Sequence, residues 1–485
     1  MAEKQQSSSD QLEWRINVGD GSSRTLVPKA GLVRRAWQGL KGVIEAFFVK
    51  KVWRFLKKAW DLGVDDPRKF IHCLKVGIAL TVVSLFYYMR PLYDGFGGNA
   101  MWAVMTVVVV FENNVGASVC KCLNRICGTS LAGFLGFGVH CLASKSGPKL
   151  EPFIVGSSVF LLASAATFSR FIPSVKARFD YGAMIFILTF SLVSVSGYRV
   201  DELLGMARER ISTIIVGTSL CILVSMLICP IWAGGELHVL IHRNMEKLAI
   251  SLEGCTSEFF QSNGGVDDKN KESNEKLLGF KCVLGSKANE EAMAKFALWE
   301  PAHGQFNYKH PWKQYLKIGS SIRSCAYCLE ALNACINSEH KVPESIMEHV
   351  SDSCLTVSSN ASRVIRELAE TMKTMKRSST IDVLLGEMNS SVQELQGNLK
   401  SLLPENGTPI MDMIPVLTCV SLLIEIANRV EAIVDAVKEL SNLAAFGFKD
   451  QDKSKQDQPK SSENLVQEKE REEQTIMTLQ RVSVL

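Results

Sequence analysis

Three cations occur in the short segment that separates two long apolar runs, at the point where a membrane would begin. Arg170, Lys176 and Arg178 lie within residues 170–180. Ionisable groups at a bilayer boundary are costly, and they usually line the path of a substrate or an ion. Positive charge at this point indicates an anion. The alternative is a cytoplasmic loop that follows the positive-inside rule, and the segment alone leaves both interpretations open.

Two opposite charges, Lys75 and Glu112, lie inside neighbouring apolar runs. Charged groups within a membrane usually have a partner. Lys75 is about one helical turn, and Glu112 about two turns, from the cytoplasmic ends of two antiparallel predicted spans. We therefore expect the two side chains to form an ion pair. The pair would either belong to a conduction path or only stabilise the bundle.

Two hydroxyl side chains, Ser378 and Ser379, follow Lys376 and Arg377 in a predicted loop between helices. A phosphate on either serine would add about −1.5 to −2 charges and could move the neighbouring helices. The segment therefore predicts a regulatory phosphorylation site. The alternative is an ordinary solvated string, because basic residues followed by serine are common on protein surfaces.

Signatures of conventional enzymes are absent from the sequence. It contains no His-Glu-x-x-His, no Gly-x-Ser-x-Gly and no Walker loop. Cys325 and Cys328 lack a second pair at zinc spacing, so we expect them in a packed core. The sequence predicts neither an enzyme nor a bound metal or cofactor. Without a Walker loop, an ATP-driven pump is disfavoured.

Composition indicates a membrane protein. The chain has 485 residues, 47% of them hydrophobic, and most of the apolar excess falls between residues 72 and 229. Its net charge of +4 is small for this length, so no nucleic-acid partner is expected. The fourteen cysteines are irregularly spaced, which indicates reduced thiols. The polar start of the chain does not resemble a cleavable signal peptide.

Six apolar runs are long enough, with their flanks, to cross a membrane. Residues 100–111 alone are too short for ~30 Å of hydrocarbon, so the second span must continue past Glu112. Lys121 and Arg125 then mark a cytoplasmic turn. In the third span Gly128, Ala132 and Gly136 recur every four residues, which predicts close helix packing. The predicted spans are 72–89, 100–119, 126–142, 152–168, 181–196 and 211–229.

The segments outside these runs have different characters. Residues 1 to about 30 are polar and predict a mobile arm. From 34 to 69, cations alternate with aromatic residues, which suits the surface of an anionic cytoplasmic leaflet better than a calmodulin target. Asp66 and Pro67 predict a helix start. The apolar core of 414–426 contains a proline and is too short for a seventh span.

The sequence thus predicts an all-α membrane protein with six transmembrane helices followed by a helical cytosolic domain. Its predicted parts are a basic amphipathic arm (1–69), a membrane domain (70–230), a cytosolic helical domain (231–448) and a disordered or weakly helical tail (449–485). Six crossings place both termini on one side, and the basic arm indicates that this side is the cytoplasm.

Several motifs resemble the plant aluminium-activated malate transporters. They include His72-Cys-Leu-Lys-Val-Gly77, the apolar string 99–110, Val175-Lys-Ala-Arg-Phe-Asp-Tyr181 and Trp299-Glu-Pro301. The resemblance covers roughly residues 65–337. It implies a homodimer whose basic pore conducts malate or inorganic anions. With it, the candidate anion path comprises Lys75, Glu112, Arg170, Lys176, Arg178, Arg199, Arg208 and Arg210. Asn113 and Asn114 depart from the family pattern, in which an aromatic or hydroxyl residue usually follows the glutamate.

The leading functional hypothesis is a passive anion channel for malate, with chloride, nitrate and sulfate as further candidates. A proton-coupled organic-acid carrier, with Glu112 as its proton site, is the alternative in transport. A membrane-anchored helical scaffold is the alternative outside transport. The resemblance favours the plasma membrane over the vacuolar membrane, and it does not establish whether aluminium gates the protein.

Overall fold

The computed structural model describes residues 14–17, 23–26, 50–89, 100–147, 149–196, 200–261, 279–336, 344–405 and 410–448. Contacts divide the chain into two compact units, Met1–Leu74 and Lys75–Leu485. In the first unit β1 (Trp14–Asn17) pairs antiparallel with β2 (Ser23–Leu26), where the sequence predicted a mobile arm. Residues 50–65 are helical, and α2 (Pro67–Tyr88) follows after Asp66.

The start of α2 agrees with the sequence prediction. The side chain of Asp66 accepts a hydrogen bond from Arg68 N at 3.3 Å, and Pro67 is the first helical residue. Proline suits this position because the first N–H groups of a helix have no partner within the helix. The cap and the proline thus fix where the first apolar helix begins.

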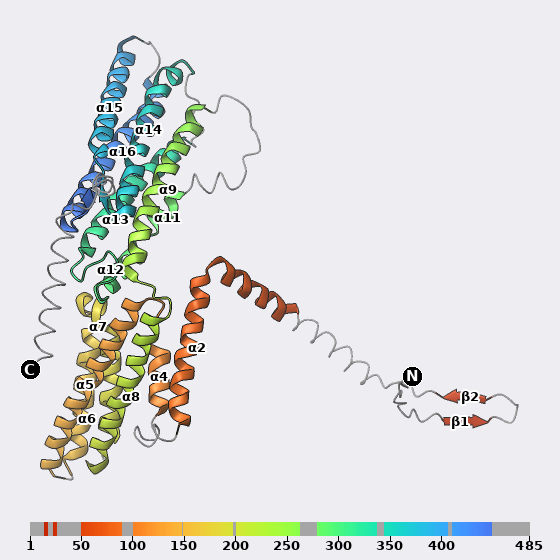
Figure 1. Ribbon diagram of the computed structural model, residues 1–485, viewed down its shortest axis with the longest axis vertical. Coiled ribbons are helices and arrows are strands. Elements are labelled where there is room, and N and C mark those ends of the chain that lie inside the picture. Colours follow the sequence, from red (N-terminus) through yellow and green to blue (C-terminus); the bar gives the residue numbers. More distant parts are fainter. Residues whose placement is uncertain are drawn as a thin grey trace, which may run out of the picture. The chain divides into compact units, whose positions relative to one another are not determined.

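The other apolar helices form a bundle with part of α2 (Figure 1). They are α4 (Ala100–Val110), α5 (Val115–Lys145), α6 (Glu151–Ser169), α7 (Pro173–Ser196) and α8 (Val200–Leu227). Side chains of α2, α4 and α8 share one buried apolar cluster, in which Ala79, Val107 and Cys221 are fully buried. We call these six helices the apolar bundle.

Successive helices of the apolar bundle run in opposite directions. At one end, Lys75 Nζ of α2 lies 2.8 Å from Cys229 O, just beyond α8. At the same end, the first N–H of α5, on Val115, donates to Ile231 O at 2.9 Å. The helices α2, α5 and α7 therefore start at this end, where α4, α6 and α8 finish (Figure 1).

The second predicted span is wrong in its boundaries, because the helix stops before Glu112. Residues 111–114 interrupt it, and α5 begins at Val115. Asn114 has extended dihedral angles (φ −111°, ψ 154°), and its side chain accepts a hydrogen bond from Ala117 N at 3.1 Å. Asparagine favours this position because its short side chain satisfies a free N–H. Lys121 and Arg125, predicted in a turn, therefore lie inside a 31-residue helix.

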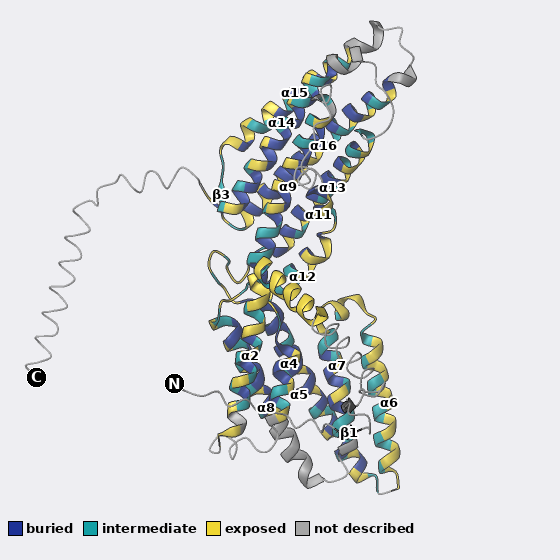
Figure 2. Ribbon diagram, turned by 90° about the vertical axis from the view of Figure 1, so that its right-hand side faces the viewer, coloured by how far each residue is buried: buried dark blue, intermediate teal, exposed yellow. Residues whose placement is uncertain are grey.

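By length and composition, four helices could cross a membrane: Val115–Lys145, Glu151–Ser169, Pro173–Ser194 and Met413–Leu443. Two apolar helices are shorter, Met101–Val110 and Ile211–Leu227. The eleven residues of α4 extend only about 16 Å at 1.5 Å per residue. The helix α6 has no buried residue, and strongly exposed apolar side chains such as Phe153, Phe160 and Leu161 are free to face lipid (Figure 2).

The predicted glycine stripe of α5 packs closely against α7. A Cβ atom on Gly128 would lie 2.6 Å from Gly182 O, and one on Gly136 would lie 2.7 Å from the side chain of Val193. Neither distance is sterically acceptable, while Ala132 between the two glycines is fully buried. Small residues therefore let the two helix backbones approach, as the sequence predicted.

The helices from α9 onward share a second core. They are α9 (Ala233–Gln261), α11 (Gly279–Leu284), α12 (Lys287–Ala297), α13 (Trp312–Ile336), α14 (Glu344–Thr374), α15 (Thr380–Glu405) and α16 (Ile410–Leu443). Two short parallel strands, β3 (Lys376–Arg377) and β4 (Gly447–Phe448), join the segment before α15 to the segment after α16. Val420, Leu423 and Ile433 of α16 are buried in this core, so packing within it accounts for the apolar length of that helix.

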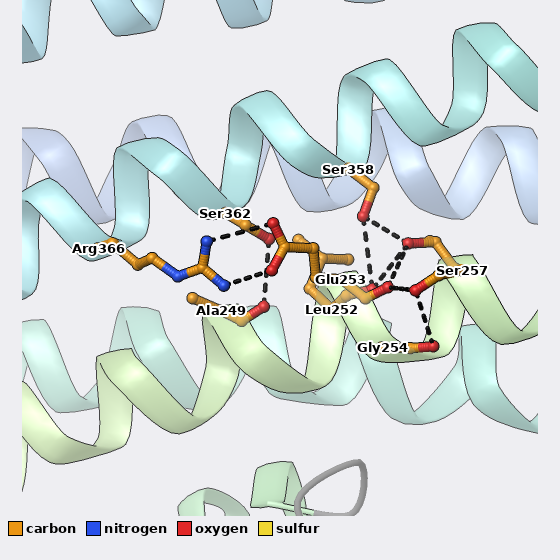
Figure 3. Close-up of polar contacts among 9 residues, drawn as sticks. Ala249, Leu252, Glu253, Gly254, Ser257, Ser358, Ser362 and Arg366 are labelled. Atoms are coloured by element: carbon orange, nitrogen blue, oxygen red, sulfur yellow. Dashed lines mark hydrogen bonds and ion pairs between the residues drawn. The ribbon is translucent and has the colours of Figure 1, made fainter.

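Polar contacts hold α9 against α14 (Figure 3). Ser362 Oγ donates to Ala249 O at 3.2 Å, and Ser358 Oγ donates to Leu252 O at 3.4 Å. Arg366, the next residue at four-residue spacing, pairs with Glu253 through both carboxylate oxygens. The serines are small enough to let the helices approach, and their hydroxyls bond to carbonyls of the facing helix.

Candidate functional site

Lys75 is a buried cation without a carboxylate partner among the described residues. Its side chain is 1% exposed, and its ammonium donates to Cys229 O. Cys229 has a φ of 39°, which lies in the left-handed region that non-glycine residues rarely adopt. This backbone conformation directs the carbonyl toward Lys75. A carbonyl solvates the ammonium but leaves its charge uncompensated, so Lys75 keeps the ability to attract an anion.

Glu112 is paired with a different cation from the one predicted. It forms an ion pair with Lys121, one helix further along the chain, and both side chains are about one-third exposed. The predicted Lys75–Glu112 pair is therefore wrong. Its physical reason is the break at residues 111–114, which directs Glu112 toward α5 instead of along a continued α4. Lys121 also lies 5.7 Å from the centre of the Tyr181 ring, a cation–π distance.

The three cations that follow α6 differ in their surroundings. Arg170 forms a two-pronged pair with Asp180, with N–O distances of 2.7 and 3.4 Å. Lys176 and Arg178 are exposed, and the Arg178 carbonyl accepts a hydrogen bond from Asn124 Nδ2 at 3.1 Å. Of this segment, Lys176 and Arg178 are the cations that can meet an arriving anion, because the charge of Arg170 is compensated.

Arg125 is a candidate that the sequence analysis did not select. Its side chain is 8% exposed within α5, and one guanidinium nitrogen donates to Tyr181 Oη at 3.1 Å. Its Nε atom is buried without a hydrogen-bond partner. Arg125 pairs with no carboxylate of the described residues. A buried guanidinium with a free N–H donor is costly unless an acceptor binds that donor and balances the positive charge. A small anion has both properties.

The remaining predicted cations cannot be placed. Arg199 lies outside the described residues, and Arg208 and Arg210 lie on α8 with side chains that are not described. A cavity of about 390 Å³ between α5, α6 and α7 is unsuited to an anion, since its lining is apolar except for Asn124 and Ser169. Of the candidate cations, Lys75 and Arg125 inside the bundle and Lys176 and Arg178 at its end therefore form no ion pair with a carboxylate of the described residues.

Glu300, the carboxylate of the Trp-Glu-Pro motif, joins the apolar bundle to the helices that follow. Its Oε1 atom accepts hydrogen bonds from Gly116 N of α5 at 3.3 Å and Ala233 N of α9 at 2.5 Å. Its Oε2 atom accepts one from Gly234 N at 3.0 Å. One carboxylate thus caps the N-termini of two helices, where negative charge is favoured. We call this arrangement the Glu300 clamp.

Glycines make the Glu300 clamp possible. A Cβ atom on Gly116 would collide with the carbonyl oxygen of Phe296, and one on Gly234 would collide with the Trp312 ring. Only 4% of Glu300 is exposed, and its burial raises the pKa of the carboxyl, while the N–H donors of Gly234 and Ala233 oppose that shift. The clamp therefore depends on the close approach of two backbone segments, the first turns of α5 and α9, to one buried carboxylate.

A buried cluster of ring side chains lies close to the clamp in sequence. The hydroxyl of Tyr315 lies 3.1 Å from both His238 Nδ1 and His310 Nε2. Burial lowers the pKa of each imidazole to about 4, helped at His238 by the neighbouring His242 and His310, and raises the pKa of the Tyr315 hydroxyl. Both imidazoles are therefore neutral at neutral pH.

The predicted phosphorylation segment lies between α14 and α15. Ser379 is exposed, whereas Ser378 is partly buried and its Oγ lies 2.7 Å from Thr380 Oγ1. Both serines line a cavity of about 310 Å³. Arg377 donates to Ser441 O and to Asn442 Oδ1 at the end of α16. Ser379 is therefore the accessible hydroxyl of the two.

Comparison with known proteins identifies, along most of the chain, the same family that the sequence motifs resemble. Residues 60–406 match the family model "aluminium activated malate transporter". Aluminum-activated malate transporter 10 of Arabidopsis thaliana is 53% identical over 470 residues, 90% of this chain and 94% of that protein. Aluminum-activated malate transporter 2 of Arabidopsis thaliana is 46% identical over 399 residues, 82% and 79% of the two chains.

A relative from another plant shows similar coverage. Aluminum-activated malate transporter 1 of Triticum aestivum is 39% identical over 401 residues, 81% of this chain and 86% of that protein. The residues that the family model matches, 60–406, include the apolar bundle, the Glu300 clamp and most of the helices beyond it. From this match and from the apolar helices of the structure, we conclude that this chain is a membrane protein and belongs to the aluminium-activated malate transporter family.

Proposed function

We propose that the protein is a passive channel that conducts malate and small inorganic anions. The observation that carries the proposal is the pair of buried cations, Lys75 and Arg125, that no described carboxylate neutralises. A conducting site must bind an anion well enough to admit it and weakly enough to release it. Arg125 keeps one donor free, and Lys75 is already partly solvated by a carbonyl, which favours reversible binding.

The proposed arrangement has six crossings, both termini and the α9–α16 helices in the cytoplasm, and two copies of the chain. Alternating helix directions support the crossings, and α4, too short to cross by itself, would cross only together with the non-helical residues 111–114 that follow it. The basic residues before α2 support the orientation. The dimer and the plasma membrane rest on the family resemblance. Lys176 and Arg178 would then lie at the cytoplasmic mouth and raise the local concentration of anions.

Reconstitution of the purified protein in planar bilayers tests the channel directly. With a malate gradient and a separate pH gradient, we expect reversal potentials that follow malate and ignore pH. Potentials that follow the proton gradient would identify a proton-coupled carrier instead. That alternative has less support, since its proton site, Glu112, is ion-paired with Lys121. Absence of current from folded protein would favour a scaffold.

Substitution of Arg125 links the current to the buried cations. We expect Arg125→Gln to reduce malate conductance at least tenfold and Arg125→Lys to retain only part of it, because lysine keeps the positive charge but lacks the planar fork of N–H donors. Arg363→Ala is the control. Arg363 is an exposed arginine on α14, outside the apolar bundle, where it pairs with Glu387. Unchanged conductance in correctly folded Arg125→Gln protein would remove Arg125 from the path.

A further inference from the structure

The helix formed by residues 50–65 separates its apolar and basic side chains completely. At 100° per residue, the apolar side chains occupy an arc of about 200°, and all the cations fall within about 120° of the opposite side. The apolar side is formed by Val52, Trp53, Phe55, Leu56, Ala59, Trp60, Leu62 and Val64. The basic side is formed by Lys50, Lys51, Arg54, Lys57 and Lys58.

The apolar side of this helix is uncovered. Its large side chains are all exposed, from 38% at Val52 to 70% at Phe55 and 74% at Trp60. In Figure 2 the colour of exposed residues marks almost all of the helix. An apolar surface of this size is unfavourable in water and marks a site of association. Trp53 and Trp60 have the largest rings of this surface, so they add strongly to its exposed apolar area.

Two observations identify the occupant as a lipid surface. One residue, Asp66, separates this helix from α2, whose own outward side chains Leu74 and Leu85 are exposed apolar groups suited to lipid. A helix that ends where a lipid-facing helix begins lies at the bilayer surface. The second observation is charge, since five cations and only two carboxylates, Asp61 and Asp65, lie opposite the apolar side, and their net positive charge complements an anionic leaflet.

We propose that residues 50–65 lie in the plane of the membrane interface, with Trp53, Phe55 and Trp60 at the level of the acyl-chain boundary and the lysines among anionic headgroups. Tryptophan is favoured at this depth because its ring is apolar and its N–H is polar. Long lysine side chains reach the headgroups while their stems cover apolar surface. The occupant is an anionic phospholipid surface; its cytoplasmic side rests on the topology proposed above, whereas the binding itself does not.

Quenching of tryptophan fluorescence in the full-length protein tests the proposal. The protein is reconstituted in vesicles of phosphatidylcholine alone or with about one-third phosphatidylserine, each with brominated acyl chains. Because the chain has eight tryptophans, the signal of two is obtained by difference from the Trp53→Phe/Trp60→Phe variant. We expect this difference signal to be quenched strongly with phosphatidylserine, and less without it.

Charge variants supply the control. Lys57→Gln/Lys58→Gln removes two of the five cations and should weaken the surface association about thirtyfold, which lowers the quenching in the mixed vesicles. Lys281→Gln/Lys287→Gln removes two exposed lysines elsewhere and should leave it unchanged. The proposal is overturned if the difference signal escapes quenching, or if phosphatidylserine has no effect on it. Capture of the helix by calcium-loaded calmodulin, with no quenching by acyl chains, would assign the apolar side to a protein partner and also overturn it.

Discussion

At the scale of single residues, the surroundings of each cation decide its capacity for anions more than its place in the sequence. Arg170 and Arg125 are the same side chain in neighbouring parts of the bundle. Arg170 is matched by Asp180, whereas Arg125 has only the hydroxyl of Tyr181. The net charge offered to an anion is therefore near zero at the first and about one unit at the second.

The ion pair of Glu112 leads to a prediction at this scale. Glu112→Gln and Lys121→Gln should couple in a double-mutant cycle on malate conductance by about 0.5 kcal/mol or more, since contacting residues are not additive. Glu112→Gln and Lys75→Gln should be additive within error, because these two side chains have different partners. A larger coupling in the second cycle than in the first would contradict the contacts described above.

At the scale of secondary-structure elements, short capping interactions set the helix boundaries. Asn114 starts α5, and Asp66 starts α2. The Glu300 clamp caps α5 and α9 together. Helix N-termini leave several N–H groups without partners, so one side chain that satisfies two termini fixes the helices relative to each other.

The Glu300 clamp predicts a large loss of stability on a small change. Glu300→Gln keeps the size of the side chain but replaces one acceptor oxygen with an NH₂ donor that faces a backbone N–H. Hydrogen bonds to charged groups contribute ~1.5 to 3 kcal/mol, so we expect a loss of about 2 kcal/mol or more and a fall of about 5 °C in Tm. Thermal unfolding in detergent measures this shift. Glu330→Gln, on an exposed part of α13, should change Tm by less than about 1 °C.

Ser379 gives a prediction for regulation at the start of α15. Phosphate on this exposed serine would favour the N-terminus of a helix and would approach Lys438, which already pairs with Asp382 at 2.6 Å. We expect Ser379→Glu to shift the voltage dependence of the current, and Ser379→Ala to resemble the unmodified protein. If both variants match the wild-type current, the segment is an ordinary solvated loop.

At the scale of the whole molecule, the sequence predicted well which segments form apolar helices, and it predicted their partners poorly. Runs of apolar residues and a strong proline start are local signals, and they located α2, α6 and the end of α7 to within a few residues. The start of α7 was predicted eight residues too late, because Lys176 and Arg178 made its first turns look like a loop. The break before α5 was missed because hydropathy does not register a cap by Asn114. Arg125 was missed for the same reason, since a helix assumed to start at 126 leaves it in a turn.

The mispairing of Lys75 has a different cause. Depth within a predicted span ranks residues along one axis, but it does not say which sides of two helices face each other. The carbonyl of Cys229 is a main-chain group in an unusual conformation, and a pattern of side chains gives no signal for it. Partners over long sequence separations therefore required the structure.

The buried histidines predict how the folded protein responds to acid. The pKa of His238 and of His310 falls from 6.5 to about 4 on folding. A lowered histidine pKa means that stability is complete above about pH 6.5 and is lost as the pH falls toward 4, because folding then requires release of a proton. Each pKa unit corresponds to about 1.4 kcal/mol, so the total loss is a few kcal/mol.

Thermal unfolding of the full chain between pH 7.5 and pH 4.5 measures this effect. We expect Tm to fall over the lower half of this range, and His310→Gln to reduce the slope because one titrating group is gone. His349→Gln, which alters an exposed histidine on α14, should leave the slope unchanged. An equal slope in the His310→Gln protein would contradict the assignment.

The Glu300 clamp also has a mechanical consequence. It grips α5 at its first turn, and Arg125 lies ten residues further along the same rigid helix, about 15 Å away. If α5 tilted by about 5° about its first turn, the guanidinium of Arg125 would move sideways by about 1 Å. The same carboxylate also binds the first turn of α9. A movement of the helices beyond the bundle would therefore tilt α5 and, in the proposed channel, change the distance between Arg125 and a permeating ion.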